Sequence, residues 1–214
     1  NHYTASRRLR SDDAYTPGGI AGFRPDYATV VYTQILKKLY PSSSVLIGGI
    51  EASMRRLMHY DYWRDRLEPS ILISSGADLL IYGMAERAVA QLAGRLLAGE
   101  RMKEIHDLPQ SAFTVSSDTV LPALPGVRDK ALRPCHEALA SRKAYAENFV
   151  LFEKTSNSIK PVRLTEQCGD VTVVVNPPLP PATEAETDAV YDLLFNYAPH
   201  PRYKKKGAIP AWEM

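Results

Sequence analysis

The sequence predicts an α/β fold: a partial doubly wound (Rossmann-like) parallel sheet with an added α+β segment. Residues 45–47 and 79–82 are short apolar runs, and each is followed directly by glycine, at Gly48 and Gly83. Helical patterns precede and follow both runs. An alternation of buried strands with helices is typical of a parallel sheet covered on both faces.

Residues 1–100 are expected to form the first part of this fold. Residues 1–25 are rich in Arg, Asp, Gly and Pro and show no periodicity, which predicts a long loop. Asp26 can cap a helix that ends before Pro41, because proline cannot continue the hydrogen-bond ladder. A short helix over residues 51–58 is expected, and the run after Gly83 predicts an amphipathic helix that stops near Gly99. The side chains on its apolar stripe are Val89, Leu92, Ala93, Leu96 and Leu97.

Residues 101–182 are expected to form an α+β extension. Residues 112–115 predict a strand, and residues 162–164 and 171–175 predict two strands joined by a glycine-containing turn. Residues 134–153 predict the longest helix. The side chains expected to face the core from this helix are Leu139, Ala146, Phe149 and Val150.

Residues 183–214 are expected to form a helix and a connection. The proline-rich run at 176–181 predicts a stiff extended linker in polyproline conformation before them. Thr183 and Glu186 have the spacing of a capping box, which predicts a helix starting at this point.

Composition excludes several classes of protein. The chain has 214 residues, 45% of them hydrophobic, and a formal net charge of only +2, so we expect no nucleic-acid partner. The longest apolar stretches are too short to span a bilayer, so no membrane partner is expected. The chain does not open with a charged and then apolar leader, and we expect a cytoplasmic protein.

The two cysteines, Cys135 and Cys168, are separated by 32 residues and have no other thiol near them in sequence. This spacing fits no zinc or iron–sulfur pattern, and no metal ligand is assigned. We expect both to be free, partly buried thiols in a reducing compartment, because a disulfide framework is typical of small secreted proteins.

Long and idiosyncratic strings resemble segments of the YgiQ-type radical SAM proteins. They span essentially the whole chain and lie at residues 1–10, 12–19, 47–53, 59–63, 76–84, 176–178 and 200–201. The resemblance implies an N-terminal domain similar to cobalamin-binding domains, followed by a radical SAM barrel with a C-x-x-x-C-x-x-C motif. The chain is then an interior piece: it covers the later part of that domain and the link to the barrel. We expect the motif shortly after Met214.

The resemblance also implies a function. The chain would be an accessory portion of a radical SAM iron–sulfur enzyme of unknown substrate, not catalytic alone, and its partner would be the missing barrel of the same protein. A four-iron cluster and S-adenosylmethionine are expected in the full-length protein and no cofactor in this piece. Cobalamin is a possible ligand of the family's domain, without support from the residues of this chain. The alternative is a free-standing module for a nucleotide or cobalamin-type ligand. An RNA-binding module is disfavoured by the near-neutral charge.

Candidate ligand-binding residues follow the two predicted strands. Gly48, Gly49 and Gly83 lie where an open α/β sheet binds ligands, and Ser53 could donate a hydroxyl there. The alternative is that these glycines only make tight strand-to-helix turns. No catalytic residue is assigned.

Arg7, Arg8 and Arg10 form a second candidate site. Guanidinium groups bind phosphate in a bidentate way, so these arginines could contact an anionic substrate or cofactor. The alternative is a solvated loop in which they pair with Asp12 and Asp13.

Two further clusters of charged or titratable residues have both a functional and a structural interpretation. Residues 59–63 combine a histidine and a carboxylate with aromatic rings, which would suit either proton transfer or the packing of one element against another. Residues 204–206 are three consecutive lysines, which favour a solvated hinge over an RNA contact.

The predicted sheet lacks its leading strands, so residues 45–47 are expected to form an unpaired edge. We therefore expect the isolated chain to self-associate, unless strands from residues 112–175 cover that side.

A prediction about the cysteines follows. A radical SAM cluster is held by three thiolates, and the chain has two. Anaerobic reconstitution with iron and sulfide should therefore yield no stoichiometric four-iron cluster, measured as iron and sulfide content and charge-transfer absorbance. One cluster per chain would contradict this account of Cys135 and Cys168.

Overall fold

The fold is described from a computed structural model that covers residues 3–4, 6–156 and 158–213. Residues 1, 2 and 5, which belong to one of the resembling strings, lie outside it. The chain divides into two compact units, residues 32–181 and residues 1–31 with 182–214. The strands expected beyond residue 100 therefore belong to the same unit as those before it.

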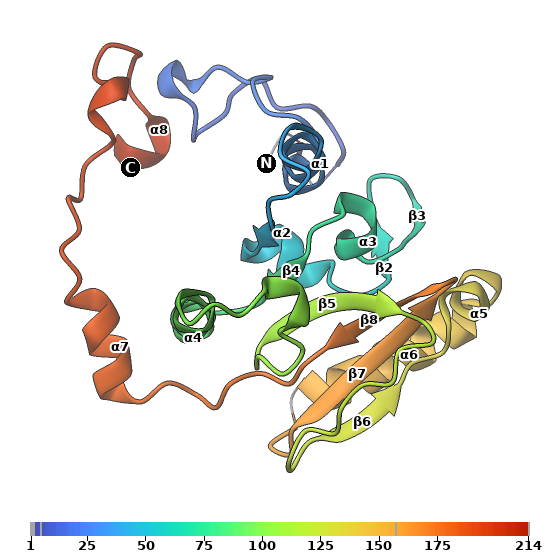
Figure 1. The fold of residues 1–214 in the computed structure, drawn as a ribbon. Helices are drawn as coiled ribbons and strands as arrows, with labels where there is room; N and C mark the ends of the chain where they lie inside the picture. The colour runs from blue at the N-terminus through green and yellow to red at the C-terminus, as the bar shows by residue number, and fades with distance from the viewer. Residues whose placement is uncertain (1–2, 5, 157, 214) are drawn as a thin grey trace. The chain divides into compact units, whose positions relative to one another are not determined.

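The larger unit is built on a six-stranded sheet with the strand order β1-β4-β5-β8-β7-β6 (Figure 1). The β1–β4 and β6–β7 pairs are parallel and the other pairs antiparallel. The strands are β1 (Leu46–Ile47), β4 (Leu79–Ile81), β5 (Ser111–Ser116), β6 (Arg128–Ala131), β7 (Val162–Cys168) and β8 (Val171–Val175).

Helices and one hairpin surround this sheet. The hairpin pairs β2 (His59–Asp61) with β3 (Arg66–Glu68) and was not predicted. The helices are α1 (Ala28–Leu39), α2 (Gly49–Met54), α3 (Ile71–Ser75), α4 (Glu86–Leu97), α5 (Cys135–Ala140) and α6 (Arg142–Ser156), with a 3-10 turn at Met102–Glu104.

The core forms where α4 packs on the centre of the sheet. All three residues of β4 are buried, which explains their wholly apolar sequence. The α4 helix contributes Ala88 and Leu92, and Phe113 and Val174 come from β5 and β8. The α/β class is confirmed, with β1 and β4 as the expected parallel pair and the added segment extending their sheet with mostly antiparallel strands.

The predicted hairpin over residues 162–175 is also confirmed. Five residue pairs join β7 to β8 in antiparallel register, from Leu164–Val175 to Cys168–Val171. Gly169 lies in the turn with a φ of 65°, a conformation that favours glycine.

The single long helix predicted over residues 134–153 is wrong. It breaks at Ser141, which has an extended backbone (φ −142°, ψ 115°) between α5 and α6. The side chain of Asn148 turns inward, accepting from the Arg133 N–H and donating to the Arg133 carbonyl at 2.7 and 2.9 Å. With Asn148 facing inward, the four side chains expected in the core are exposed: Leu139, Ala146, Phe149 and Val150.

The prediction of two free thiols is also wrong. Cys135 at the start of α5 and Cys168 at the end of β7 are joined as a disulfide, with 4.9 Å between their Cα atoms. Sequence spacing could not reveal this, because packing of α5 on β7 brings the two residues together.

The smaller unit joins the two ends of the chain. The N–H of Gly18 donates to the carbonyl of Ala208 at 2.7 Å, and that of Ala211 to Ala14 at 2.8 Å. The predicted capping box of Thr183 and Glu186 is confirmed at the start of α7. The unit contains α7 (Glu184–Tyr191), α8 (Pro210–Glu213) and the 3-10 turns Pro17–Gly19 and Pro201–Tyr203.

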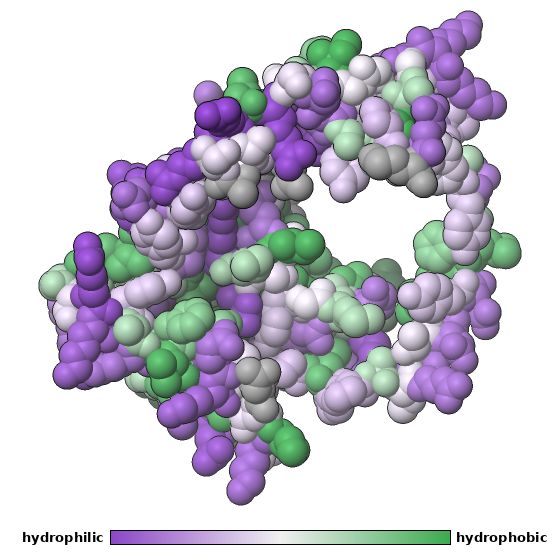
Figure 2. Space-filling model, turned by 180° about the vertical axis from the view of Figure 1, so that it is seen from behind, coloured by the Kyte–Doolittle hydropathy of each residue, from purple (hydrophilic) through white to green (hydrophobic). Residues whose placement is uncertain are grey.

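Two surface features concern the state of the chain in solution. Within the described residues, β1 is an edge strand, as predicted, and no helix has the length and apolar character needed to cross a membrane. Apolar side chains are exposed among polar ones (Figure 2). On α1, which precedes β1, those between 44% and 63% exposed are Tyr32, Ile35, Leu36 and Leu39.

We predict that the 23.8 kDa chain self-associates, because an open edge and an exposed apolar helix face both favour association. Light scattering after size exclusion should show a dimer or larger species. Replacing Ile35 and Leu39 together by Glu should shift it toward the monomer, and Lys38→Glu on the same helix should not. A monodisperse wild-type monomer would contradict the prediction.

Candidate functional site

The strand-end residues predicted as a site lie together in the structure. Because β1 and β4 are parallel neighbours, Gly48 and Gly83 follow them at the same edge of the sheet. The N–H of Gly83 donates to the Ser53 hydroxyl oxygen at 3.2 Å. Gly49 is the first residue of α2, the helix that also carries Ser53.

Local geometry explains two of these glycines. A Cβ atom at Gly48 would lie 3.2 Å from the carbonyl oxygen of Ile81, so close approach of β1 to β4 favours glycine here. Gly83 has a φ of 69°, which allows the chain to turn sharply after β4. These glycines therefore make tight strand-to-helix turns, as in the alternative interpretation of their role. Ligand binding by them stays a prediction.

A cavity of about 200 Å³ lies beside this edge of the sheet. It is bounded by Tyr82 at the end of β4, by Asn176 and Pro177 after β8, and by Phe152 and Thr155 of α6. Arg56, which follows α2, also lines it. A cavity at a sheet edge with few polar groups is the usual form of a small-ligand site.

Arg56 is the cation of this cavity. Its guanidinium carbon lies 4.5 Å from the ring centroid of Tyr82 and 4.7 Å from that of Phe152, so it is held between two aromatic rings. One terminal nitrogen donates to the Ser53 carbonyl. The buried Nε has no hydrogen-bond partner. Burial lowers the pKa of Arg56, because the charged form loses hydration.

Asn176 supplies a second polar group to the same cavity. Its Nδ2 donates to the carbonyls of His106 and Leu108 at 3.0 and 2.8 Å and to the Ser111 hydroxyl at 3.3 Å. The backbone carbonyl of Asn176 accepts from the Tyr82 hydroxyl at 2.6 Å. The buried Oδ1 has no partner. The cavity therefore has an unpaired donor on one wall residue and an unpaired acceptor on another.

Tyr82 contacts both Arg56 and Asn176. Its ring contacts the Arg56 guanidinium and its hydroxyl donates to the backbone of Asn176. Burial raises the pKa of Tyr82, and the nearby Arg56 charge opposes this only in part. The phenol therefore stays protonated and keeps donating at neutral pH.

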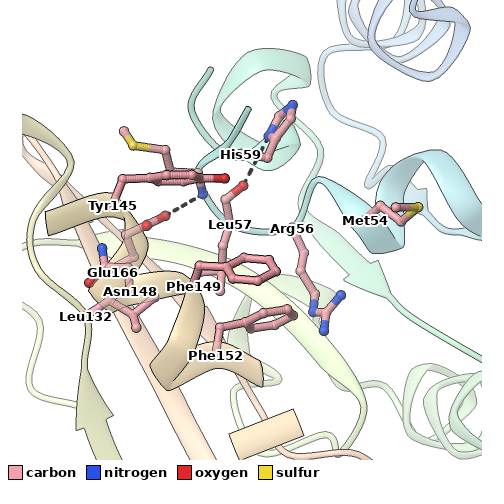
Figure 3. Close-up of a pocket in the computed structure, with 11 residues that line it drawn as sticks. Met54, Arg56, Leu57, His59, Leu132, Tyr145, Asn148, Phe149, Phe152 and Glu166 are labelled. Atoms are coloured by element: carbon pink, nitrogen blue, oxygen red, sulfur yellow. Dashed lines mark hydrogen bonds between the residues drawn. The ribbon is translucent and has the colours of Figure 1, made fainter. Parts of the chain in front are cut away.

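A second cavity, of about 90 Å³, is also lined by Arg56 and Phe152 (Figure 3). Glu166 of β7 lines it, with its carboxyl 1% exposed and accepting from the N–H of Met58 at 2.7 Å. Burial raises the pKa of Glu166 to about 7, although the Met58 hydrogen bond works against the rise.

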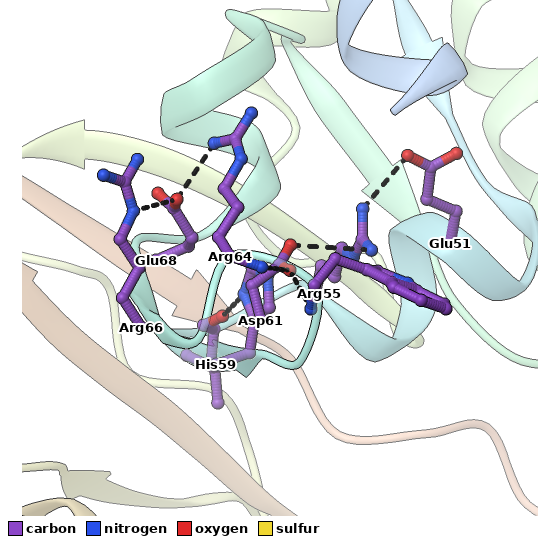
Figure 4. A network of polar contacts seen from close by, with 9 residues as sticks. Glu51, Arg55, His59, Asp61, Arg64, Arg66 and Glu68 are labelled. Atoms are coloured by element: carbon purple, nitrogen blue, oxygen red, sulfur yellow. Dashed lines mark hydrogen bonds and ion pairs between the residues drawn. The ribbon is translucent and has the colours of Figure 1, made fainter. Parts of the chain in front are cut away.

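The cluster at residues 59–63 holds the β2–β3 hairpin (Figure 4). Asp61 is buried and accepts from the N–H groups of Trp63 and Arg64 at 2.9 and 3.0 Å. The Nδ1 of His59 faces the carbonyl of Leu57 at 3.2 Å, and burial lowers the pKa of His59. These contacts support the packing interpretation, because Asp61 bonds its own turn.

The predicted arginine site lies in the smaller unit. Arg7, Arg8 and Arg10 are exposed, and the Nε of Arg10 donates to the Tyr3 carbonyl at 3.2 Å. The residues 204–206 belong to the same unit and are also largely exposed.

An ion pair between a buried carboxylate and a partly exposed arginine holds the loop that carries these arginines. It joins Asp13 to Arg24 rather than to the predicted arginines. Burial alone would raise the pKa of Asp13, but hydrogen bonds from Arg24, the Tyr15 N–H and Thr16 lower it to about 2. The contacts of Asp13 therefore order the loop and leave anion binding by the arginines as a prediction.

No sequence pattern indicates a site role for Arg56 or Glu166. Asn176 belongs to the predicted proline-rich linker and to one of the resembling strings, and neither indicates a role in binding. Arg56 stands in an Arg-Arg-Leu-Met run that reads as the end of a helix. A polar residue closing the valine-rich strand 171–175 was the one available signal for Asn176, since such a residue must find partners when buried.

Comparison with known proteins identifies relatives of the chain. A family described as Radical SAM N-terminal matches residues 1–214. The chain is 49% identical to a UPF0313 protein of Porphyromonas gingivalis and 45% identical to one of Bacteroides thetaiotaomicron, over its full length, and covers 33% and 36% of those proteins. It is 46% identical, over 99% of its length, to a UPF0313 protein of Geobacter sulfurreducens and covers 34% of it. The chain thus spans about a third of these relatives. No solved structure matches it.

We predict that Asn176→Ala lowers the free energy of unfolding by about 1–3 kcal/mol, because the His106 carbonyl loses its side-chain donor and the Leu108 carbonyl keeps only the Ser111 hydroxyl. Chemical denaturation of the chain measures this change. Gln167→Ala, at an exposed position of β7, is the control and should stay within about 0.5 kcal/mol of wild type. Equal effects of the two substitutions would contradict the anchoring role of Asn176.

Proposed function

The chain belongs to the Radical SAM N-terminal family and forms an N-terminal portion of a larger protein of that family; on this premise we propose that it is the accessory part of a YgiQ-type radical SAM iron–sulfur enzyme. In this role it supplies part of the substrate pocket, while the barrel outside this chain carries out the reaction.

The proposal assigns the iron–sulfur cluster and S-adenosylmethionine to that other part of the protein. The cluster needs three thiolates on one loop, and the two cysteines here lie on different elements, α5 and β7. These residues do not fit the cluster, so no step of the reaction is assigned to them. Cobalamin likewise has no specific support, because the strand-end glycines are accounted for as turns.

The observation that carries the proposal is the cavity around Arg56. Arg56 with an unpaired Nε and Asn176 with an unpaired amide oxygen line the same cavity, and this pair is suited to a small anionic group that also carries a hydrogen-bond donor. A monoprotonated phosphate has this chemistry, because it is an anion that keeps one O–H donor, whereas a carboxylate only accepts. Such a group on the substrate would be held at the sheet edge and presented to the rest of the protein.

Exposed apolar side chains next to this edge support the same role. Ile50 and Met54 of α2 and Met84 after β4 are 81%, 75% and 76% exposed. They flank the Ser53–Gly83 contact, so they form one rim of the strand ends. We propose that this rim is covered by the part of the protein outside this chain, because the relatives are about three times as long as this chain.

Inorganic phosphate is the probe for this proposal. Calorimetry should detect its binding, and Arg56→Gln should weaken that binding about tenfold or more, since a charge-assisted hydrogen bond is worth about 1.5–3 kcal/mol. Arg142→Gln, at an exposed arginine of α6, is the matched control and should bind as wild type does.

Three results would count against the proposal. They are no phosphate binding by the wild-type chain, equal loss in both variants, and tight binding of hydroxocobalamin that Gly83→Ala abolishes and Arg56→Gln leaves unchanged. The last result would favour the free-standing cobalamin-type module instead.

A further inference from the structure

We propose that Cys135, Cys168 and Glu166 form a zinc site when the two cysteines are reduced. One sulfur from each cysteine and one carboxylate oxygen all lie within 4.8 Å of one another. Thiolate and carboxylate are both established ligands of zinc in proteins. Neither cysteine nor Glu166 lines the 200 Å³ cavity of the proposed function, and the inference does not depend on that function.

The three ligands come from two elements that the fold holds together. Cys135 begins α5, and Glu166 and Cys168 lie on β7, two positions apart and therefore on the same face of the strand. The Cα atoms of the cysteines are 4.9 Å apart. Tetrahedral zinc, with a Zn–S distance of about 2.3 Å, separates two sulfurs by about 3.8 Å. Rotation of the two side chains can provide this separation once the disulfide is reduced.

Burial of Glu166 is the second argument. Its side chain lies in the interior, 1% exposed, and none of the described residues forms an ion pair with it. A buried carboxylate is costly unless a cation or several hydrogen bonds compensate it. A divalent metal held by Glu166 would supply that cation.

The surroundings suit a metal. Met58, Ala138 and Tyr145 pack with the two cysteines in an apolar cluster that shields them from water. The N–H of Met58 already orients the Glu166 carboxylate at 2.7 Å, as outer hydrogen bonds orient metal ligands elsewhere. A cavity of about 90 Å³ adjoins Glu166 and is large enough for a water molecule.

Ligand chemistry selects zinc over the other common divalent ions. Calcium and magnesium take oxygen ligands, and two thiolates exclude them. Two sulfurs and one oxygen, with an open fourth position, match the mixed ligand sets of zinc.

Zinc and the disulfide are alternative states of the same cysteines. A phosphine reduces the disulfide: two electrons from phosphorus and two protons from water produce two thiols, and the phosphine takes up the oxygen of that water. Zinc then displaces the two thiol protons, and that of Glu166 where it is protonated, into solvent. A small-molecule disulfide, itself reduced to two thiols, would accept the two electrons, re-form the Cys135–Cys168 bond and release the metal.

The test titrates the chain, reduced by a phosphine, with zinc in competition with a chelating dye. We expect one zinc per reduced chain and no stoichiometric binding by the oxidised chain. Cobalt in place of zinc should give thiolate-to-metal charge transfer and the visible bands of tetrahedral cobalt. Glu166→Gln should weaken binding about tenfold or more, and Cys135→Ser or Cys168→Ser should abolish stoichiometric binding.

Two controls separate a metal site from a folding defect. Glu137→Gln, on the same helix as Cys135 and with a side chain 43% exposed, should bind zinc as wild type does. In the wild-type chain, zinc should slow alkylation of both cysteines, which needs no variant. No zinc bound to the reduced wild type, unprotected thiols, or equal affinity in Glu166→Gln and Glu137→Gln would overturn the proposal.

Discussion

The buried side chain of Asn176 is the constraint on which the sheet edge depends. It follows β8 directly, and its amide nitrogen donates to the carbonyls of His106 and Leu108, on the loop before β5. Its backbone carbonyl accepts from Tyr82, which follows β4. One residue thus ties the ends of three strand regions together. Burial of a residue with this many polar atoms is stable only because nearly all of them are paired.

The atoms left unpaired have consequences for function. The Oδ1 of Asn176 and the Nε of Arg56 are both buried without partners, in residues that line the same cavity. Tyr82 contacts both residues, so it links the anchor of the sheet to the cation. An unpaired donor and acceptor cost stability in the absence of a ligand. Such a cost is typical of a site whose partners come from outside the chain.

The two cysteines show how tertiary packing changes the meaning of a residue. Far apart in sequence, they fit no metal pattern; in the fold they lie at the start of α5 and the end of β7, beside Glu166. The same packing makes the disulfide and would make the zinc site. Because the two states use the same sulfurs, the redox conditions around the protein would decide between them.

The sequence by itself determined the local elements and the family. Apolar runs ending in glycine identified β1 and β4, the turn at Gly169 identified the β7–β8 hairpin, and the spacing of Thr183 and Glu186 identified a helix start, because these signals are local. Tertiary structure decided the break at Ser141, the inward turn of Asn148, the disulfide and the Arg56 cavity. Each of these depends on partners distant in sequence, and no local pattern records which distant group a buried polar atom will meet.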